Sequence, residues 1–490
     1  MREVITLQFG ENANYVGAHF WNLQQAYKHE DQIQELFSRH SPARAVPRAL
    51  VFDTAGNFGS LAIEEGLQSA GSDGADGERA LWGGAVEVHR QDLHAKGSSA
   101  AGPGSEEAAG PGSVDAVPDR VQFWSDFGQA RLAPHAASRV SGVEFGNGLG
   151  EMNTFAEGAR VFAGSDSRED ALEGGFRVFA EECDHLQGFQ VLADAVGGFA
   201  GYASGFMSRI RDEYPKAPLL LYSIARTPTA AQLPGSLLTD AAVAVAANFE
   251  AVSMTVPLLA PLGASKLRPN LEIMAGDFYQ ASSFMAANVA QWCHCLQAGT
   301  RSLDEIVAQV TQQEYYTVAE SLLAPGLRVP DASGAGRDVL AEADEIVERS
   351  FVGCSGAATD RLSKTAGQLV VDRGTRMSDL IADRYPDSAW IKSDAPMELP
   401  RAFPQIFHGI DRHGRFAATA GAGRAGRVSV AGLLCTGAAS LGYLQQLHAA
   451  LRSEQSRPLR DYEREAVREH RYALDRAIDR YSEIRAAADE

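Results

Sequence analysis

Residues 186–215 read LQGFQVLADAVGGFAGYASGFMSRIRDEYP. The apolar run at 189–192 predicts a strand, the glycines of GGFAG at 197–201 predict a loop, and the apolar spacing that follows predicts a helix ending at Pro215. In such a strand–loop–helix unit, backbone N–H groups at the helix N-terminus can face an anion, usually a phosphate. The main functional question is therefore whether this glycine loop binds one.

The N-terminal part of the chain has the same order of strand, turn and helix. Residues 4–9 predict a strand, GENAN at 10–14 predicts a tight turn, and apolar residues within 16–27 recur at helical spacing. A second apolar strand, ALVFD at 49–53, ends in Asp53 and a glycine-containing turn. Because ligand clefts in open parallel sheets form where strands end, both turns are candidate parts of one site.

A segment of low complexity interrupts this α/β region. Residues 69–80 and 95–116 consist mostly of Gly, Ala, Ser, Pro and acidic residues, so they cannot bury enough apolar surface to offset the entropy of ordering. Between them, residues 81–88 predict a strand or a hairpin arm, and the fold resumes at residue 121. We therefore expect a disordered Gly/Ala/Ser-rich insertion on the surface, at about 69–116.

Apolar patterns alternate with capping and breaking residues in the rest of the chain. LLLYSI at 219–224 predicts a buried parallel strand. The character of the sequence changes after Pro257, and residues 258–269 are expected to form a loop. Ser302 and Glu305 have the spacing of a capping box at a helix start. Further helices are expected at residues 170–183, 236–252, 284–296, 339–351, 375–385 and 459–487, and a strand followed by a helix is expected within 428–451.

Composition bounds the class of protein. The chain has 490 residues, 45% of them apolar, and a formal net charge of −19, which indicates a soluble globular protein of two or three domains. Because phosphate binding depends on Lys and Arg, this charge argues against nucleic acid as a partner. The N-terminus lacks the apolar core of a signal peptide and no run of about 20 apolar residues occurs, so any membrane association is expected to be peripheral.

Several short patterns point to other chemistry and are weaker. Five cysteines indicate free thiols in a reducing compartment. The run CHC at 293–295 lies in a predicted helix, where positions two apart diverge, so no metal site is expected. GAGRAG at 421–426 fits the dinucleotide pattern GxGxxG without a suitable strand before it, and an oxidoreductase would rest on it alone. His185 lies among acidic residues at a predicted helix end, and no catalytic residue is assigned.

Three separated segments resemble tubulin. Residues 2–21, REVITLQFGENANYVGAHFW, resemble the tubulin N-terminus. LQGFQ at 186–190 matches the segment before the tubulin glycine loop, and RIRDEYP at 209–215 resembles the segment after it. Together with ALVFD and EECDH, these segments look like the Misato/DML1 family of tubulin-related proteins. The parts of the chain that resemble this family are residues 1–60 and about 115–260.

The resemblance implies a tubulin/FtsZ-like fold. A Rossmann-type α/β nucleotide-binding domain would span residues 1–256, a second α+β domain 257–430, and a C-terminal helical region 431–490. The resemblance also implies a role in mitochondrial distribution and morphology and in microtubule or spindle organisation, through contacts with proteins such as tubulin or its chaperones. The expected location is the cytoplasm, with association with mitochondria, and no enzymatic reaction is implied.

Four features hold and hydrolyse GTP in tubulin, and the resemblance carries them over incompletely. In the first turn, Glu11 replaces a Gln that contacts the phosphates, whereas Asp53 matches an acid near magnesium. The glycine loop lacks the Thr and Ser hydroxyls that bond phosphate, and Phe199 at its tip would crowd one. The GxxNxD loop, which carries the catalytic acid, has no counterpart within 258–277.

Two interpretations of this degenerate site stay open. In the favoured one, the glycines are remnants that allow a tight turn and close helix–strand packing, and the protein acts without a reaction or a bound cofactor. In the alternative, the protein is a GTP-binding switch or a weak GTPase that uses GTP with magnesium. The residues that would line the GTP site are Gly10, Glu11, Asn12, Asn14, Asp53, Gly197, Gly198 and Gly201.

Overall fold

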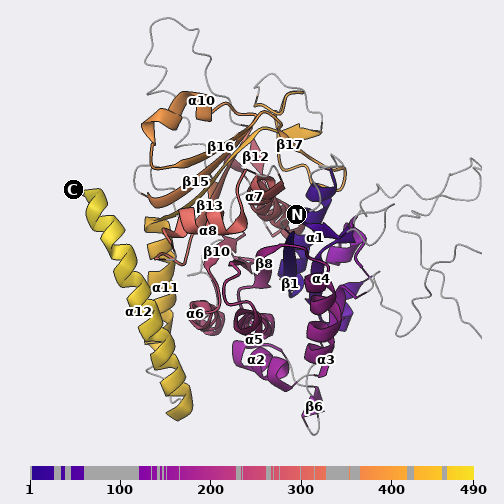
Figure 1. Ribbon diagram of the computed structural model, residues 1–490, viewed down its shortest axis with the longest axis vertical. Coiled ribbons are helices and arrows are strands. Elements are labelled where there is room, and N and C mark those ends of the chain that lie inside the picture. The colour runs from indigo at the N-terminus through magenta and orange to yellow at the C-terminus, as the bar shows by residue number, and fades with distance from the viewer. Residues whose placement is uncertain are drawn as a thin grey trace, which may run out of the picture.

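Six strands form one parallel sheet in the computed structural model of the chain (Figure 1). These strands are β1 Glu3–Phe9, β4 Ala49–Asp53, β5 Ala137–Arg139, β8 Leu186–Asp194, β9 Leu219–Ala225 and β10 Met254–Leu259. Their spatial order is β10-β9-β8-β1-β4-β5, and every neighbouring pair is parallel. Most of their residues are buried, as expected of parallel strands that are covered on both faces.

The structure describes residues 3–26, 35–38, 46–59, 121–133, 135–140, 144–145, 148–149, 152–164, 166–227, 233, 235–260, 266–268, 270–274, 276–297, 300–313, 315–326, 352–353, 365–416, 424–454 and 461–489. Three predictions lie wholly or partly outside these residues. They are the disordered insertion at 69–116, the helix at 339–351 and the GAGRAG pattern at 421–426.

Helices cover both faces of the parallel sheet because alternate side chains of the inner strands β4, β1, β8 and β9 enter two different apolar clusters. The helices concerned are α1 Glu11–Ala26, α2 Phe155–Gly164, α5 Gly198–Glu213, α6 Gly235–Asn248 and α7 Phe278–Gln297. In β1, Val4 packs in the cluster that contains α1 and α7. Ile5, Leu7 and Phe9 pack in the cluster that contains α5, and α2 lies outside α5 (Figure 1).

A second, mixed sheet lies on the far side of α7. Its strands are β13 Glu320–Pro325, β14 Val352–Gly353, β15 Thr365–Arg373, β16 Ala389–Ser393 and β19 Val430–Gly437. Their order is β14-β13-β19-β15-β16, with β15 and β16 parallel and the other neighbours antiparallel. Side chains of α7 share one apolar cluster with Leu192 of the first sheet and Leu434 of the second. The two sheets are therefore joined through a common core.

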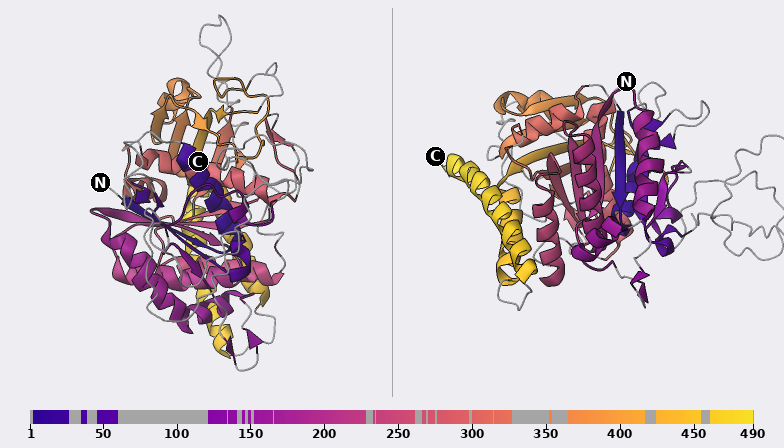
Figure 2. Two further views of the ribbon diagram at one scale, coloured as in Figure 1. Left: turned by 90° about the vertical axis from the view of Figure 1, so that its right-hand side faces the viewer. Right: turned by 60° about the horizontal axis from the view of Figure 1, so that its bottom comes forward.

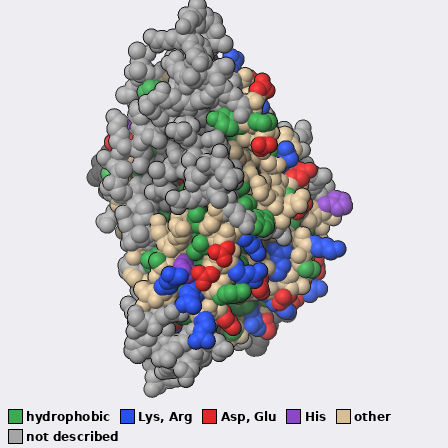
Figure 3. Space-filling view, turned by 90° about the vertical axis from the view of Figure 1, so that its left-hand side faces the viewer, with side chains coloured by type: hydrophobic (Ala, Val, Ile, Leu, Met, Phe, Trp, Pro, Cys, Tyr) green, Lys and Arg blue, Asp and Glu red, His purple; other side chains and the backbone are tan. Residues whose placement is uncertain are grey.

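Two long C-terminal helices lie along one side of the molecule (Figure 1, Figure 2). They are α11 Ala438–Glu454 and α12 Asp461–Asp489. The apolar stripe of α12, which includes Leu474 and Tyr481, packs against α6 and α11. The Tyr481 hydroxyl accepts a hydrogen bond of 2.7 Å from the Val318 N–H. The outer face carries exposed Arg468 and Glu469, and basic and acidic side chains are intermixed on the described part of this side (Figure 3).

Short elements connect these layers. The strands are β2 Phe37–Ser38, β3 Val46–Pro47, β6 Glu144–Phe145, β7 Gly148–Leu149, β11 Lys266–Arg268, β12 Leu271–Glu272, β17 Met397–Glu398 and β18 Arg427–Val428. The α-helices are α3 Asp166–Glu169, α4 Arg177–Glu181, α8 Leu303–Thr311 and α10 Ser378–Ile381, with a π-helical segment Asp170–Phe176 and 3-10 turns at Ala55–Phe58, Trp124–Asp126 and Ala382–Arg384. Among the described residues, no helix has the length and apolar character needed to cross a membrane.

Several elements that the sequence predicts are confirmed. The α/β class is confirmed by the parallel sheet and its flanking helices. The capping box is confirmed as well: the Glu305 N–H donates to Ser302 Oγ over 3.3 Å, and the Ser302 N–H donates to Glu305 Oε2 over 2.8 Å, at the start of α8. The strand and helix expected within 428–451 are β19 and α11, and the expected charged C-terminal helix is α12.

Two local predictions are wrong. Residues 258–269 were expected to form a loop, but residues 258–259 belong to β10, which continues through Pro257, and residues 266–268 form β11. A proline is tolerated there because β10 is at the edge of the first sheet, where a missing N–H donor costs little. The helix expected at 375–385 is reduced to α10 and a 3-10 turn. Its first turn cannot form because Arg376 has a φ of 64°, outside the helical region.

Candidate functional site

The predicted site residues of the N-terminal region come together at the carboxyl edge of the first sheet. β1 ends at Phe9, Gly10 makes the turn, and α1 begins at Glu11. The φ of Gly10 is +96°, which favours glycine, and its N–H donates to the Phe52 carbonyl oxygen over 3.0 Å. This bond fixes the turn beside the end of β4, where Asp53 lies.

Asp53 is fully buried, and four protein donors surround its carboxylate. Oδ1 accepts hydrogen bonds from the Thr54 N–H and from Asn57 Nδ2, each at a distance of 2.8 Å. Oδ2 accepts from Asn14 Nδ2 over 2.9 Å and from Trp124 Nε1 over 3.0 Å. Burial raises the pKa of Asp53, and these four hydrogen bonds oppose that shift. Both oxygens are thus bonded to the protein itself.

Trp124 is a site residue that the sequence pattern does not reveal. It lies in the 3-10 turn Trp124–Asp126, shortly after the range 60–120 that the structure does not describe. Its ring packs edge-on against Phe58, with the ring centroids 5.6 Å apart. The indole is 5% exposed, so its hydrogen bond to Asp53 is shielded from water. The sequence shows that Trp124 lies where the apolar pattern resumes. It does not show that Trp124 bonds to Asp53, which is 71 residues away.

A second carboxylate, that of Asp194, lies at the N-terminus of α1. Asp194 is the last residue of β8. Its Oδ1 accepts from the Ala13 N–H over 2.9 Å, and its Oδ2 accepts from Asn12 Nδ2 over 3.1 Å. Burial raises the pKa of Asp194 well above its usual range. The carboxylate therefore holds a position at which a helix N-terminus attracts anions.

Glu11 and Arg226 form the exposed rim of this site. Arg226 Nη2 lies 2.9 Å from Glu11 Oε1, and the two side chains are 44% and 42% exposed. Arg226 Nε also donates to Asn12 Oδ1. Its guanidinium lies over the Phe278 ring, 4.5 Å from the centroid, and 5.8 Å from that of Tyr15. The sequence places the Glu11 carboxylate where it would face phosphates. In the structure, Arg226 pairs with it.

The glycine stretch at 197–201 is shorter as a loop than predicted. Gly197, with a φ of +78°, makes the turn, but α5 begins at Gly198, so Gly198 and Gly201 are helical. A Cβ added to Gly201 would lie 1.9 Å from the Phe155 carbonyl oxygen of α2. A Cβ on Gly158 of α2 would lie 1.6 Å from the Gly198 carbonyl oxygen. The glycines allow close helix–helix packing, in place of the helix–strand packing that was expected.

The expected position of Phe199 is also corrected. The sequence predicts this side chain at the tip of a loop, where it would crowd a phosphate. Because α5 starts one residue earlier, Phe199 lies in the first helical turn and is 9% exposed, within the apolar cluster on that face of the sheet. Its bulk therefore fills the core.

A third acid, Asp240 of α6, lies where α2 and α5 begin. Its carboxylate accepts from the Phe155 N–H of α2 over 3.3 Å and also from the Gly197 N–H. Burial raises the pKa of Asp240, and these two bonds oppose the shift. The next N–H, that of Gly198, donates to the Met152 carbonyl oxygen over 3.0 Å. The turn before α5 is thus also bonded to groups of the chain.

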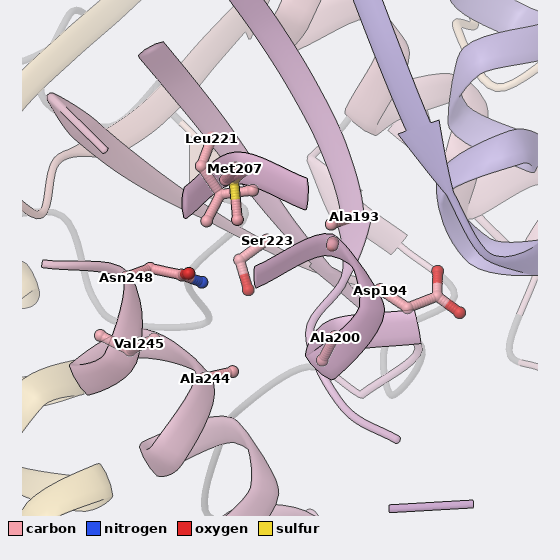
Figure 4. Close-up of a pocket in the computed structure, with 10 residues that line it drawn as sticks. Ala193, Asp194, Ala200, Met207, Leu221, Ser223, Ala244, Val245 and Asn248 are labelled. Atoms are coloured by element: carbon pink, nitrogen blue, oxygen red, sulfur yellow. The ribbon is translucent and has the colours of Figure 1, made fainter. Parts of the chain in front are cut away.

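A small cavity lies between β8, β9, α5 and α6 (Figure 4). Its volume is about 10 Å³, enough for about one water molecule and far too small for a nucleotide. Its polar lining includes Ser223 and Asn248. Asp194 also contributes to the lining, but its carboxyl group points away from the cavity, toward α1 (Figure 4). The cavity and the α1 N-terminus therefore lie on different sides of Asp194.

The described residues show no group of three or more His, Cys, Asp or Glu side chains arranged to hold a metal ion. Cys293 and Cys295 lie on α7 as buried free thiols. Burial raises the pKa of both above the usual thiol range. The GxxNxD loop has no counterpart in the sequence, and the stretch most similar to its pattern is residues 263–267. The structure describes only residues 266–267 of this stretch.

Comparisons with known proteins agree on one family. The "Misato Segment II tubulin-like domain" matches residues 2–101, and the "Tubulin domain" matches residues 114–292. The chain is 30% identical to Protein DML1 of Gibberella zeae over 237 residues, 29% to Protein dml-1 of Neurospora crassa over 240, and 29% to Protein misato homolog 1 of Mus musculus over 252. These matches span 46%, 45% and 46% of this chain and 46%, 42% and 45% of the relatives, less than half of each.

Proposed function

We propose that this chain, which belongs to the Misato/DML1 family of tubulin-related proteins, is a non-enzymatic organising factor that acts through protein–protein contacts. Its proposed role is in mitochondrial distribution and morphology and in microtubule or spindle organisation. The proposed partners are proteins, among them tubulin or its chaperones, and the proposed location is the cytoplasm with association with mitochondria. Nucleic acid is a poor partner because the net charge is −19.

The observation that carries this proposal is the Asp194 carboxylate at the N-terminus of α1. A phosphate at that position would have to displace a carboxylate that is fixed to β8 and already accepts the Ala13 N–H. It would also meet the like charge of the Glu11 carboxylate at the rim. A magnesium ion at Asp53 would compete with the four donors around that carboxylate. These contacts support a fold that is complete without a cofactor.

Rescue of a depleted cell tests this proposal. The native protein would be removed and replaced by full-length Glu11→Ala/Arg226→Ala, which removes the exposed ion pair at the rim of the site. Because a protein that works through other surfaces does not use this rim, we expect the variant to restore mitochondrial morphology and spindle organisation as well as wild type does. The readouts are light microscopy of both structures and the cellular level of the variant.

The matched control removes another exposed ion pair far from the sheet edge. Asp379 and Lys392 are 2.6 Å apart with side chains 47% and 46% exposed, so Asp379→Ala/Lys392→Ala changes charge and exposure in the same way. A rim variant that is folded and abundant but fails to rescue, while this control succeeds, would overturn the proposal that the site is unused.

A GTP-binding switch or weak GTPase is the second candidate. It is favoured by the two glycine turns, at Gly10 and Gly197, which follow the ends of β1 and β8, and by the exposure of Arg226 at the rim. Calorimetric titration of the folded protein with GTP and magnesium tests it. Saturable binding that weakens in Arg226→Ala would support the switch. The absence of binding at millimolar GTP would remove it.

A further inference from the structure

A carboxyl group of the chain is bound at the N-terminus of α1. Two donors at the helix start, the Ala13 N–H and Asn12 Nδ2, each bond to a different oxygen of Asp194, over 2.9 and 3.1 Å. These are the groups that a helix start offers to an oxyanion, because its first N–H groups have no partner within the helix. Asp194 reaches them from a strand 181 residues further along the chain.

The turn before α1 is shaped around this carboxylate. A Cβ added to Gly10 would lie 2.6 Å from the Asp194 carboxyl carbon, closer than carbon atoms approach without a bond. The φ of +96° at Gly10 directs the backbone so that the carboxylate fits against the turn. Glycine at this position thus leaves space that a side chain of the protein occupies.

A relay of polar contacts fixes the orientation of Asn12. Arg226 donates to Asn12 Oδ1, which leaves Asn12 Nδ2 directed at Asp194. The Arg226 guanidinium is itself held by Glu11, over 2.9 Å, and by the face of the Phe278 ring. The Asn12 side chain therefore separates the positive charge of Arg226 from the Asp194 carboxyl group. Arg226 lies on the side of Asn12 that faces solvent.

We propose that Asp194 is an internal replacement for an oxyanion at the α1 N-terminus, and that the donors it occupies form a site for inorganic phosphate once its carboxylate is removed. This inference deepens the proposed function, on which it rests, by naming the group that keeps the site filled. The ligand class follows from the donors: a backbone N–H, a side-chain amide and a nearby guanidinium suit a tetrahedral oxyanion.

Thermal unfolding of the full chain in phosphate and in chloride, at equal ionic strength, tests the proposal. In Asp194→Ala the vacated donors are free, so millimolar inorganic phosphate should raise the midpoint temperature by about 2 °C more than it does for wild type. The comparison with wild type is needed because phosphate stabilises most folded proteins through exclusion from their surface. An equal phosphate effect on both proteins would overturn the inference.

Two further variants make the test decisive. Asp379→Ala removes an exposed acid, and should respond to phosphate as wild type does; a gain as large as that of Asp194→Ala would show an adventitious charge effect and overturn the inference. Asp194→Ser serves as the test if the alanine variant does not fold. Its hydroxyl can accept the Ala13 N–H, while the position of the second carboxyl oxygen stays open to phosphate. Phosphate should raise its midpoint temperature more than it raises that of wild type.

The result also separates this inference from the proposed function. If folded Asp194→Ala and Asp194→Ser show no phosphate-specific gain, Asp194 is a structural acid only, and the non-enzymatic role is untouched. If wild type binds GTP with magnesium in calorimetry, the proposed function fails together with the idea that Asp194 keeps the site filled.

Discussion

Two helices of the parallel sheet begin after a strand and a glycine turn, yet the two turns serve different purposes. At α1, the turn at Gly10 makes room for a carboxylate, and Asp194 bonds to the helix start. At α5, the turn at Gly197 leads into a helix whose glycines make room for another helix, with Gly201 against the Phe155 backbone of α2. The first arrangement is electrostatic and the second is steric.

This difference shows what a glycine turn after a strand establishes by itself. Such a turn indicates that another group approaches the backbone closely. It does not indicate whether that group is a ligand, a side chain or another helix. In this chain the neighbour belongs to the protein in both places. Each substitution below changes one side of the comparison, and they are ordered from the largest expected effect to the smallest.

Asp53→Ala should be the most damaging change on the α1 side. It leaves four donors, those of Asn14, Thr54, Asn57 and Trp124, without their acceptor in a buried place. We expect a loss of about 4 kcal/mol in the free energy of unfolding. Urea unfolding followed by tryptophan fluorescence measures it. The exposed Asp379→Ala should change stability by about 0.5 kcal/mol, and a similar small loss at Asp53 would contradict the buried network.

Gly201→Ala tests the close packing of α2 against α5. Its methyl group would lie 1.9 Å from the Phe155 carbonyl oxygen, so α2 and α5 must move apart. The expected loss is about 3 kcal/mol in the free energy of unfolding, measured by urea unfolding. Gly442→Ala is the matched control, because Gly442 lies in α11 with nothing within 4 Å of an added Cβ. It should be stabilising by about 1 kcal/mol; equal losses at both glycines would contradict close packing.

The pH dependence of stability tests the charge at the α1 side. Burial raises the folded-state pKa of Asp194 well above its usual range. Between the unfolded pKa of about 4 and the folded value, the folded state binds the extra proton, so this group's contribution to stability falls as pH rises through that window. Asp194→Asn abolishes this titration. Its stability relative to wild type should therefore increase from about pH 4 upward and then level off.

Urea unfolding of both proteins over a pH series measures that difference. The charges that act on Asp194 are those of Asp53 and Glu11, which add to the shift, and Arg226, which opposes it. Burial lowers the pKa of His19 to about 3, but that group titrates in both proteins and cancels in the difference. A difference that stays constant or shrinks with rising pH would contradict a raised pKa at Asp194.

The rim of the site should matter least to stability. Arg226→Ala removes an ion pair with Glu11 in which both side chains are more than two-fifths exposed, 44% and 42%. Exposed pairs contribute little because water and salt screen them, so the expected loss is about 0.5 kcal/mol. Thermal unfolding at low and high salt measures it. A loss of several kcal/mol would show that Arg226 holds Asn12 and Asp194 in place more strongly than its exposure indicates.

Much of the first sheet could be predicted because its information is local. The runs at 4–9, 49–53 and 219–224 are apolar and continuous, and β1, β4 and β9 follow them closely. β10 was missed because Pro257 suggests a break, and only the edge position explains why a strand tolerates it.

The contacts of the site could not be predicted in the same way. Asp194 meets Ala13 across 181 residues, and Arg226 meets Asn12 across 214, so no local pattern connects them. One signal was present in the sequence. Gly198, Gly201 and Gly205 recur at three and four residues, which places them on one helical face and predicts close packing of a helix.

The nucleotide content of the purified, folded wild-type protein tests the central claim most directly, since the claim is that groups of the chain fill the positions of a nucleotide. The protein would be denatured and the released nucleotides separated by anion-exchange chromatography and quantified against protein concentration. We predict far less than one nucleotide per chain. About one GTP or GDP per chain would contradict the claim, because Asp194 and the ligand could not both occupy the α1 N-terminus.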